Sequence, residues 1–153
     1  MMKPEKKRIE AQTVIAMRHS GSYDEIGGVY RQLHEWARER DVKVKGNGFT
    51  VFLSPPSEFD SQSAHFEVCL PTDSAPKPEG GVTVRKLPAC TVAAVVVKGP
   101  YSTIPGHYTE MLAWLAAEGL EVAGPPREAY IKRPDARGRG KPEEFVTEIQ
   151  FPV

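Results

Sequence analysis

The fold is decided by two stretches of the sequence, TVIAMRHSGSYDEIGGVYRQLHEWARERDVKVKG (residues 13–46) and TVAAVVVKGPYSTIPGHYTEMLAWLAAEGLEVAG (residues 91–124). At a constant offset of 78 residues (91 − 13) they share eleven identities over 34 positions, where ordinary residue frequencies give roughly two by chance. The identical pairs include Gly21/Gly99, Tyr23/Tyr101, Ile26/Ile104, Gly28/Gly106, Tyr30/Tyr108 and Trp36/Trp114. A second pair of similar segments, FEVCLP and TEIQFP, aligns Glu67 with Glu148 at an offset of 81 (148 − 67). The sequence therefore predicts a duplicated half-domain and not a solenoid, whose repeats run to roughly 20–50 residues.

Each copy predicts the same order of elements, namely a strand, a helix and two further strands. The strands are expected at about 13–18, 49–53 and 66–70 in the first copy, and at about 92–97, 127–132 and 145–151 in the second. Apolar residues at the three-and-four spacing of one helical face follow each first strand. In the first helix these are Ile26, Val29, Tyr30, Leu33, Trp36 and Ala37, and in the second Ile104, Tyr108, Met111, Leu112 and Leu115. Pro105 suits a first helical turn and Gly119 a C-terminal cap.

One helix on a small sheet leaves much of that sheet bare, so the two copies are expected to pair. We predict one α+β domain over residues 1–153, with a first half at about 9–72, a linker at 73–82 and a second half at about 83–153. The duplicated strand–helix–strand–strand module would form a pseudo-twofold antiparallel sheet with the helices packed against it. The linker is expected to be flexible. A groove at such an internal interface is a common place for a small-molecule site, which predicts a central ligand cleft.

The composition is that of a globular protein, and its balanced charge favours neither nucleic acid nor anionic membranes as a partner. Hydrophobic residues make up 40% and charged residues 26% of the chain, and twenty basic residues balance twenty acidic ones. We therefore expect no direct binding to nucleic acid and none to membranes. The N-terminus lacks the apolar core of a signal peptide, and Cys69 and Cys90 read as reduced thiols, so we expect a cytoplasmic protein. Neither the cysteines nor the four histidines have metal-ligand spacing, so no metal or cofactor is expected.

Aromatic and acidic residues are the remaining candidates for chemistry, since the sequence contains no G-x-S-x-G nucleophile motif. Glu128 and Tyr130, in REAYIK (127–132), lie two residues apart in a predicted strand and so share a face. Glu67 and Glu148 also fall in predicted strands, where an exposed face would explain them equally well. A carboxylate in a groove walled by rings would favour flat cations, because the rings stabilise the cation and the carboxylate neutralises its charge.

The aromatic residues at repeated positions have two interpretations. They are either core residues that pack the helices on the sheet or the walls of the predicted cleft. Packing is the favoured interpretation for Trp36 and Trp114, which lie further along the helices. Tyr30 and Tyr108 occur early in the two helices, where the central groove would reach them. The turn tyrosine Tyr101 belongs to the same set of candidates.

The duplicated pattern, with GPYSTIPGHYTEMLAWL, PREAYIKRP and the ending EEFVTEIQFPV, resembles the GyrI-like (gyrase-inhibitor-like) small-molecule-binding domain from about Ile9 to Val153. That family includes effector-binding domains of multidrug-responsive transcription activators and stand-alone multidrug-binding proteins. The resemblance implies two modules around a central cleft, and it places the buried drug-binding glutamate of the family on Glu128. It also implies site aromatics at Tyr30, Tyr108, Tyr130 and Phe145, with a weaker match at Phe49, and a second acidic residue at Glu143 or Glu144.

Two functions follow as alternatives. The first is a multidrug-binding protein that takes planar aromatic, often cationic, compounds into the cleft; the candidate ligand-binding residues are Glu128, Tyr108, Tyr30, Tyr130, Phe145, Phe49, Glu148, Trp114 and Tyr101. The second is a hydrolase, which some relatives resemble, that opens reactive cyclopropane rings of genotoxic natural products, with Glu128 or Glu148 activating water. A protein partner such as DNA gyrase is a third possibility. Because activators carry a DNA-binding domain before this module and only a dozen residues precede the first predicted strand, we expect no direct transcriptional control.

Overall fold

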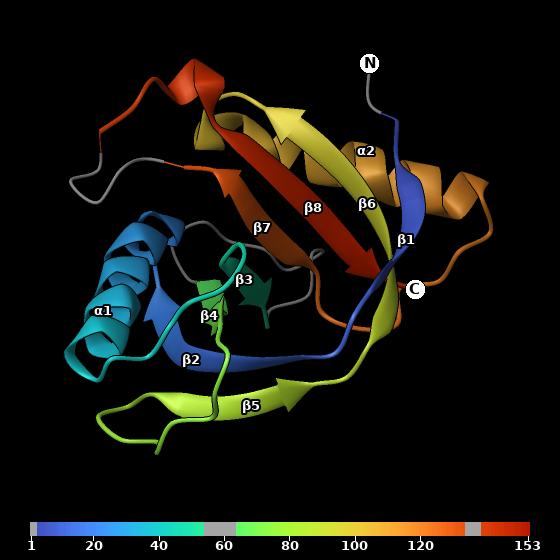
Figure 1. Ribbon diagram of the computed structural model, residues 1–153. Coiled ribbons are helices and arrows are strands. Elements are labelled where there is room, and N and C mark those ends of the chain that lie inside the picture. Colours follow the sequence, from blue (N-terminus) through green and yellow to red (C-terminus); the bar gives the residue numbers. More distant parts are fainter. Residues whose placement is uncertain (1–2, 54–63, 134–138) are drawn as a thin grey trace. The chain divides into compact units, whose positions relative to one another are not determined.

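The chain folds as an α+β protein with two compact units, each built from one helix and four antiparallel strands (Figure 1). The computed structural model describes residues 3–53, 64–133 and 139–153. One unit comprises Met1–Ile9 and Cys90–Val153 and is called the C-terminal unit below. The other comprises Glu10–Ala89 and is called the N-terminal unit. The predicted duplication and fold class are confirmed by these two similar units.

The N-terminal unit has the strand order β5-β2-β4-β3. Its elements are β2 (Gln12–Gly21), the short 3-10 helix η1 (Tyr23–Glu25), α1 (Ile26–Glu39), β3 (Phe49–Phe52), β4 (Ala64–Pro71) and β5 (Thr83–Leu87). Helix α1 packs against β2 and β4. The six residues predicted to form its apolar face, Ile26, Val29, Tyr30, Leu33, Trp36 and Ala37, are all buried.

The C-terminal unit has the equivalent strand order β1-β6-β8-β7. Its elements are β1 (Glu5–Ile9), β6 (Cys90–Lys98), η3 (Tyr101–Thr103), α2 (Ile104–Ala117), β7 (Arg127–Lys132), η4 (Pro142–Glu144) and β8 (Val146–Pro152). Helix α2 buries Ile104, Met111 and Leu115 against one face of the sheet. That core is completed by Ala93, Val95, Val97, Ile149 and Phe151.

Edge strands β1 and β5 were not predicted, and they are exchanged between the repeats. Strand β1 precedes β2 in the chain but pairs with β6, whereas β5 precedes β6 but pairs with β2. The edge strand of each unit is therefore the segment that comes just before the first long strand of the other unit in the sequence. The segment predicted as a flexible linker is also attached to α1, because the Trp36 ring nitrogen donates a 3.1 Å hydrogen bond to the carbonyl of Glu79. Arg40 forms a 2.7 Å ion pair with the carboxylate of the same Glu79.

The repeated residues make equivalent contacts in the two units. Tyr23 stacks on Phe52 with ring centroids 6.0 Å apart, and Tyr101 meets Tyr130, 78 positions after Phe52, edge-on at the same centroid distance of 6.0 Å. Both helices also end alike. Gly119 has φ +68° after α2, as predicted for a C-terminal cap, and Asp41 adopts φ +53° at the corresponding position after α1.

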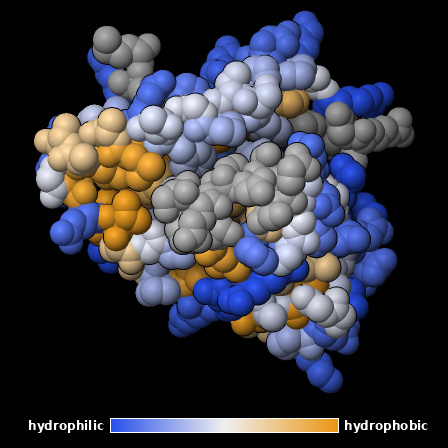
Figure 2. Space-filling model, turned by 180° about the vertical axis from the view of Figure 1, so that it is seen from behind, coloured by the Kyte–Doolittle hydropathy of each residue, from blue (hydrophilic) through white to orange (hydrophobic). Residues whose placement is uncertain are grey.

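The outward faces of the two helices differ. Helix α1 exposes charged residues such as Arg31, Glu35 and Arg38, whereas α2 exposes Ala113 and Leu112. The prediction that Leu112 belongs to the buried face is wrong, because this side chain is 38% exposed. The apolar area at the left of Figure 2 lies over α2, which Figure 1 draws behind β6 and β8.

Two further observations bear on the predictions from composition. In the part of the chain that the structure describes, no helix is both long enough and apolar enough to cross a membrane. In the described residues Cys69 and Cys90 are not joined by a disulfide; Cys69 is buried and Cys90 partly buried.

Candidate functional site

Strand β7 places Glu128 and Tyr130 on the face of its sheet that α2 covers. In the antiparallel register Glu128 lies opposite Ile149 and Tyr130 opposite Thr147. Directly opposed residues point to the same side, and Ile149 belongs to the core beneath α2. Both side chains are withdrawn from water, since Glu128 is 1% and Tyr130 7% exposed. The strand period therefore predicts their shared face correctly, and the face is buried.

Helix α2 supplies a hydrogen-bond donor to the buried carboxylate. The hydroxyl of Tyr108 donates to Oε2 of Glu128 at 2.6 Å. The Tyr108 ring meets Phe151 edge-on, with centroids 5.7 Å apart, and this contact orients the phenol towards the sheet. A buried carboxylate without hydrogen bonds is costly, and the phenol offsets part of that cost.

Aromatic rings from three separate segments contact one another, and one of them, Tyr130, lies two residues from Glu128 on the same strand face. Tyr101, in η3, stacks on Phe145 with centroids 5.1 Å apart and planes 28° apart. Tyr101 also contacts the ring of Tyr130, the neighbour of Glu128 on the same strand face. The backbone holds this arrangement, because the amide of Gly99 donates a 2.8 Å hydrogen bond to the carbonyl of Phe145 just before β8. We call Glu128, Tyr108, Tyr101, Tyr130 and Phe145 the Glu128 site.

Two other predicted site residues of the C-terminal unit have different surroundings. Trp114 packs against the core beneath α2. Glu148 lies opposite Ala129 on β7, so it points to the face of the sheet away from Glu128. There it receives 2.7 Å hydrogen bonds from Lys7 and from Gln150. The structure thus separates the two glutamates that the sequence offered as alternative bases.

Tyr30 and Phe49 belong to the N-terminal unit. Tyr30 is 7% exposed, and its ring tilts against His34 at a centroid distance of 4.8 Å. Its hydroxyl lies so close to the backbone of Gly48 that a Cβ there would be 2.0 Å from the oxygen. Phe49 is buried and lies opposite Cys69 on β4. Because neighbouring residues of a strand point to opposite faces, Phe49 and Thr50 lie on opposite faces of the sheet.

The Glu128 site has no acidic counterpart at the repeated strand position. Residue 50 (128 − 78) is the buried Thr50. Sequence comparison of the two halves reveals this asymmetry. The donor Tyr108 is repeated as Tyr30, so the hydroxyl is common to both units and the carboxylate occurs in one. The bond between helix and strand could be read only from the fold.

Comparison with known proteins adds the family. The model of the family described as the GyrI-like small molecule binding domain matches residues 2–153. The chain belongs to the GyrI-like family. This membership confirms the resemblance drawn from the duplicated motifs. No curated protein sequence matches the chain.

Solved structures that resemble this GyrI-like chain confirm the fold. The crystal structure of the EcmrR C-terminal domain is 24% identical with a TM-score of 0.85, and the alignment covers 100% of this chain and 98% of that domain. EcmrR in its DNA complex is 23% identical with a TM-score of 0.89 over 99% of this chain, which spans 57% of the EcmrR chain.

More distant structures carry different functional names. A hydrolase from Listeria innocua is 15% identical with a TM-score of 0.65, covering 99% of this chain and 91% of its own. SAV2435, whose structure holds bound tetraphenylphosphonium, is 14% identical with a TM-score of 0.64, covering 99% of this chain and 93% of its own. At these identities the likeness shows the shared fold.

Proposed function

We propose that this GyrI-like chain binds planar aromatic, often cationic, molecules at the Glu128 site. The observation that supports the proposal is a carboxylate 1% exposed to water, held at 2.6 Å by the hydroxyl of Tyr108. Tyr130, two residues along the same strand face, belongs to a group of rings in contact with one another, completed by Tyr101 and Phe145. Family membership supplies the general activity, small-molecule binding, and these residues supply the proposed chemical preference.

The preference for cations follows from the two kinds of group in the site. A phenol is an uncharged donor, so the bond from Tyr108 leaves the negative charge of an ionised Glu128 in place. A cation that approaches the carboxylate gains Coulomb attraction in surroundings of low dielectric constant. Aromatic faces add cation–π attraction worth about 2 kcal/mol when the pair is desolvated. Both attractions depend little on direction, so the site should accept several unrelated compounds.

The closed state of the site implies that the side chains move when a ligand binds. Glu128, Tyr130 and Phe145 are each no more than 7% exposed, whereas Tyr108 is only partly buried and sits on α2. A flat molecule therefore reaches the carboxylate after Tyr108 gives up its hydrogen bond or α2 shifts. The ligand then takes the place of the phenol beside Glu128. We expect this rearrangement to slow association, as a required conformational change generally does.

The proposal can be tested with one charged and one neutral aromatic probe. We expect the planar cation N-methylacridinium to bind with micromolar affinity, measured by quenching of tryptophan fluorescence, and the equally flat but uncharged acridine, under mildly alkaline conditions, to bind more weakly. Glu128→Gln should weaken binding of the cation about tenfold, or ~1.4 kcal/mol, and leave binding of the neutral probe unchanged. The matched control is Glu110→Gln, which removes the same charge from a side chain on α2 that is 61% exposed.

Two outcomes would contradict the proposal. Equal affinity of Glu128→Gln and the unchanged protein for N-methylacridinium would remove the carboxylate from the ligand site. An equal loss of affinity in Glu110→Gln would show that the effect is long-range attraction by net charge. A circular dichroism spectrum of each variant shows that the fold is retained.

A second candidate function is hydrolysis of reactive cyclopropane rings. It is favoured by the same pair of groups, because Glu128 is a possible base and Tyr108 a possible proton donor 2.6 Å away. Glu128 would take a proton from water as the water oxygen bonds to a ring carbon and a ring C–C bond breaks. The electron pair of the broken bond would pass to a conjugated acceptor in the substrate, which Tyr108 would protonate. Tyr108 would then recover its proton from Glu128.

Mass spectrometry distinguishes this function from binding alone. The chain would be incubated with a cyclopropane-bearing natural product, and the expected hydrolase product gains one water. Turnover lost in Glu128→Gln and kept in Glu110→Gln would support catalysis by the Glu128 site. No turnover above buffer would remove this candidate and leave the binding proposal intact.

A further inference from the structure

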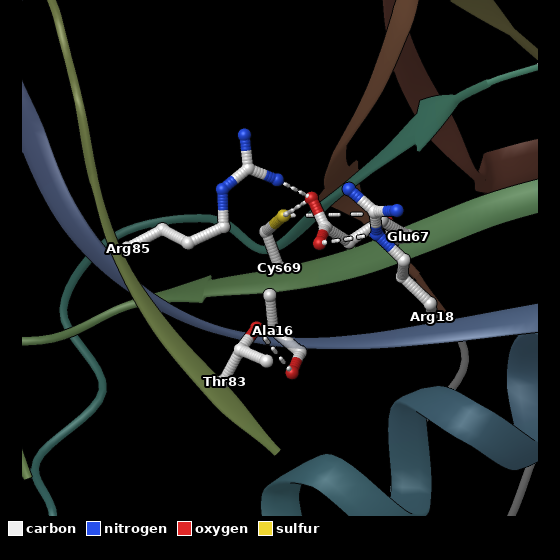
Figure 3. Close-up of polar contacts among 6 residues, drawn as sticks. All are labelled: Ala16, Arg18, Glu67, Cys69, Thr83 and Arg85. Atoms are coloured by element: carbon white, nitrogen blue, oxygen red, sulfur yellow. Dashed lines mark hydrogen bonds and ion pairs between the residues drawn. The ribbon is translucent and has the colours of Figure 1, made fainter. Parts of the chain in front are cut away.

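A second group of charged residues lies in the N-terminal unit, around a buried carboxylate. Glu67, on β4, is 1% exposed. Nη1 of Arg85 donates a hydrogen bond to its Oε1, and Nε of Arg18 lies 3.4 Å from its Oε2. Figure 3 shows the two guanidinium groups on either side of the carboxylate. We call these three residues the Arg18–Glu67–Arg85 cluster.

The register places all three side chains on one face of the sheet. Arg18 on β2 lies directly opposite Glu67 on β4. Arg85 on β5 lies opposite Val14, which is four residues before Arg18 on the same strand. Because residues an even number of positions apart share a strand face, Arg85 projects on the side of Arg18 and Glu67. The polar cluster thus spans three adjacent strands.

The C-terminal unit provides an internal comparison for the charge of this cluster. Its equivalent glutamate, Glu148, is 6% exposed, and among residues 3–53, 64–133 and 139–153 its one basic partner is Lys7, at 2.7 Å. Lys7 lies opposite Val92, the position that repeats Val14, so it corresponds to Arg85. One cation and the amide of Gln150 are sufficient for that buried carboxylate.

Arg18 is therefore a surplus positive charge. Its repeated position, 96 (18 + 78), is occupied by Val96, which is 55% exposed. Two arginines against one carboxylate leave the cluster with a net charge of about +1, because arginine stays protonated. The neutralisation of Glu67 does not require this second guanidinium.

Both arginines have donors that face outward. The side chain of Arg18 is 69% and that of Arg85 41% exposed. Arg18 uses Nε and Arg85 uses Nη1 in their bonds to Glu67. For the other guanidinium nitrogens of these two residues, the described part of the chain offers no hydrogen-bond or ion-pair partner.

We propose that the Arg18–Glu67–Arg85 cluster is a binding site for a small oxyanion, the phosphate or carboxylate group of a ligand. The planar guanidinium fork matches both kinds of group through paired N–H donors. Glu67 holds the two arginines in place before the anion arrives, so less side-chain freedom is lost on binding. This site is separate from the Glu128 site and has the opposite charge preference.

The test follows the Nε–Hε resonances of arginine by NMR while inorganic phosphate is added to the full chain, at constant ionic strength. We expect saturable shifts of Arg18 and Arg85. Arg18→Val should weaken the affinity about tenfold, or ~1.4 kcal/mol, and the N-terminal unit should tolerate this change because Val96 already occupies the equivalent position. Arg31→Val removes an equal charge from the exposed face of α1 and should leave the affinity unchanged.

The outcomes are distinguishable. A parallel titration with benzoate identifies the group, since saturation by phosphate alone, by benzoate alone or by both names the oxyanion that the site accepts. Linear shifts without saturation for both anions would overturn the proposal. So would equal losses of affinity in Arg18→Val and Arg31→Val, because equal losses indicate general attraction by charge. Arg18→Gln, which keeps a polar side chain, repeats the comparison if the valine variant is poorly folded.

Discussion

The hydroxyl of Tyr108 donates a 2.6 Å hydrogen bond to Oε2 of Glu128, and so joins helix α2 to strand β7 beneath it. The bond satisfies a carboxylate that is 1% exposed. It also couples the proposed ligand site to the stability of the C-terminal unit, because the helix that covers the carboxylate is held by the same bond that a ligand would replace.

We expect Tyr108→Phe to destabilise the protein. The change removes a donor from a buried acceptor and should lower the free energy of unfolding by about 1–3 kcal/mol, measured by urea denaturation. In a Glu128→Met background the same change should cost much less, since no carboxylate remains to be satisfied. Equal losses in the two backgrounds would show that the bond contributes nothing and that the phenol acts only through packing.

The sequence predicted which residues of β7 share a face, but not the contacts that other elements make with them. Alternation along β7 places Glu128 and Tyr130 on one face, and the structure agrees. The contact of Tyr108 with Glu128 depends on where α2 rests on the sheet, and helical periodicity does not determine that position. Periodicity likewise could not place Glu148 on the opposite face, because the register of β7 against β8 is set by tertiary pairing.

Gly48→Ala should displace Tyr30 from its present place. The added Cβ would lie 2.0 Å from the Tyr30 hydroxyl oxygen and 2.6 Å from Cζ, so the ring has to move. Overpacking of this kind costs about 1–3 kcal/mol. Tyr30→Leu removes the clashing atoms, so the double variant should be more stable than the sum of the two single losses predicts. If urea denaturation showed that the two losses of stability simply add, the close contact between Gly48 and the Tyr30 hydroxyl would be contradicted.

A matched glycine control has the opposite expected sign. Gly106, in the first turns of α2, has nothing within 4 Å of an added Cβ. Gly106→Ala should therefore raise the stability by up to about 1 kcal/mol through helix propensity. A loss in this variant as large as that of Gly48→Ala would mean that glycine substitution is harmful in general.

Asp41→Gly should stabilise the N-terminal unit. Asp41 has φ +53°, a left-handed conformation that strains a residue with a Cβ, and its repeat partner is Gly119 with φ +68°. Glycine relieves about 1 kcal/mol of this strain, and thermal unfolding should show a higher Tm. The reciprocal change Gly119→Ala should lower the Tm. A lower Tm for Asp41→Gly would show that the aspartate side chain contributes more than its backbone strain costs.

Glu25 should titrate below the ordinary range for a glutamate. The hydrogen bond with Nε2 of His19, at 3.1 Å, lowers the pKa of Glu25, and the bond from the backbone amide of Ser22 lowers it further. Because the pKa is lower in the folded state, this contribution to stability is fully present above the pKa of an unfolded glutamate. It is lost as the pH falls through the folded pKa.

Carboxyl ¹³C NMR measures this titration directly. His19→Phe should raise the pKa of Glu25, since a phenyl ring cannot donate the hydrogen bond that is the largest cause of the shift. Ser22 should still donate through its backbone in that variant, so a smaller downward shift should remain. An ordinary pKa for Glu25 in the unchanged protein would contradict the contact with His19.

The sequence predicted the elements that have a local apolar pattern. It did not predict the strands whose hydrogen-bonded partners are far away along the chain. The helices and the three strands of each repeat follow from their own periodicity. Strand β1, with the sequence EKKRI, is mostly charged, and β5, with TVRKL, carries two adjacent basic residues, as is common in edge strands. Their partners are also distant along the chain, since Glu5 pairs with Ala94, 89 positions later (94 − 5). No local pattern specifies such a pairing.

The exchange of edge strands makes a prediction that a simple tandem repeat would not. Deletion of residues 1–9 should expose the edge of β6 (Cys90–Lys98) and leave β2 (Gln12–Gly21) paired with β5 as before. The deletion also removes Lys7 from the buried carboxylate of Glu148, and loss of a partner from a buried charge is strongly destabilising. Amide hydrogen exchange should therefore accelerate across β6 more than across β2. If β1 stabilised the repeat that follows it in the chain, the order would be reversed, with β2 exchanging faster.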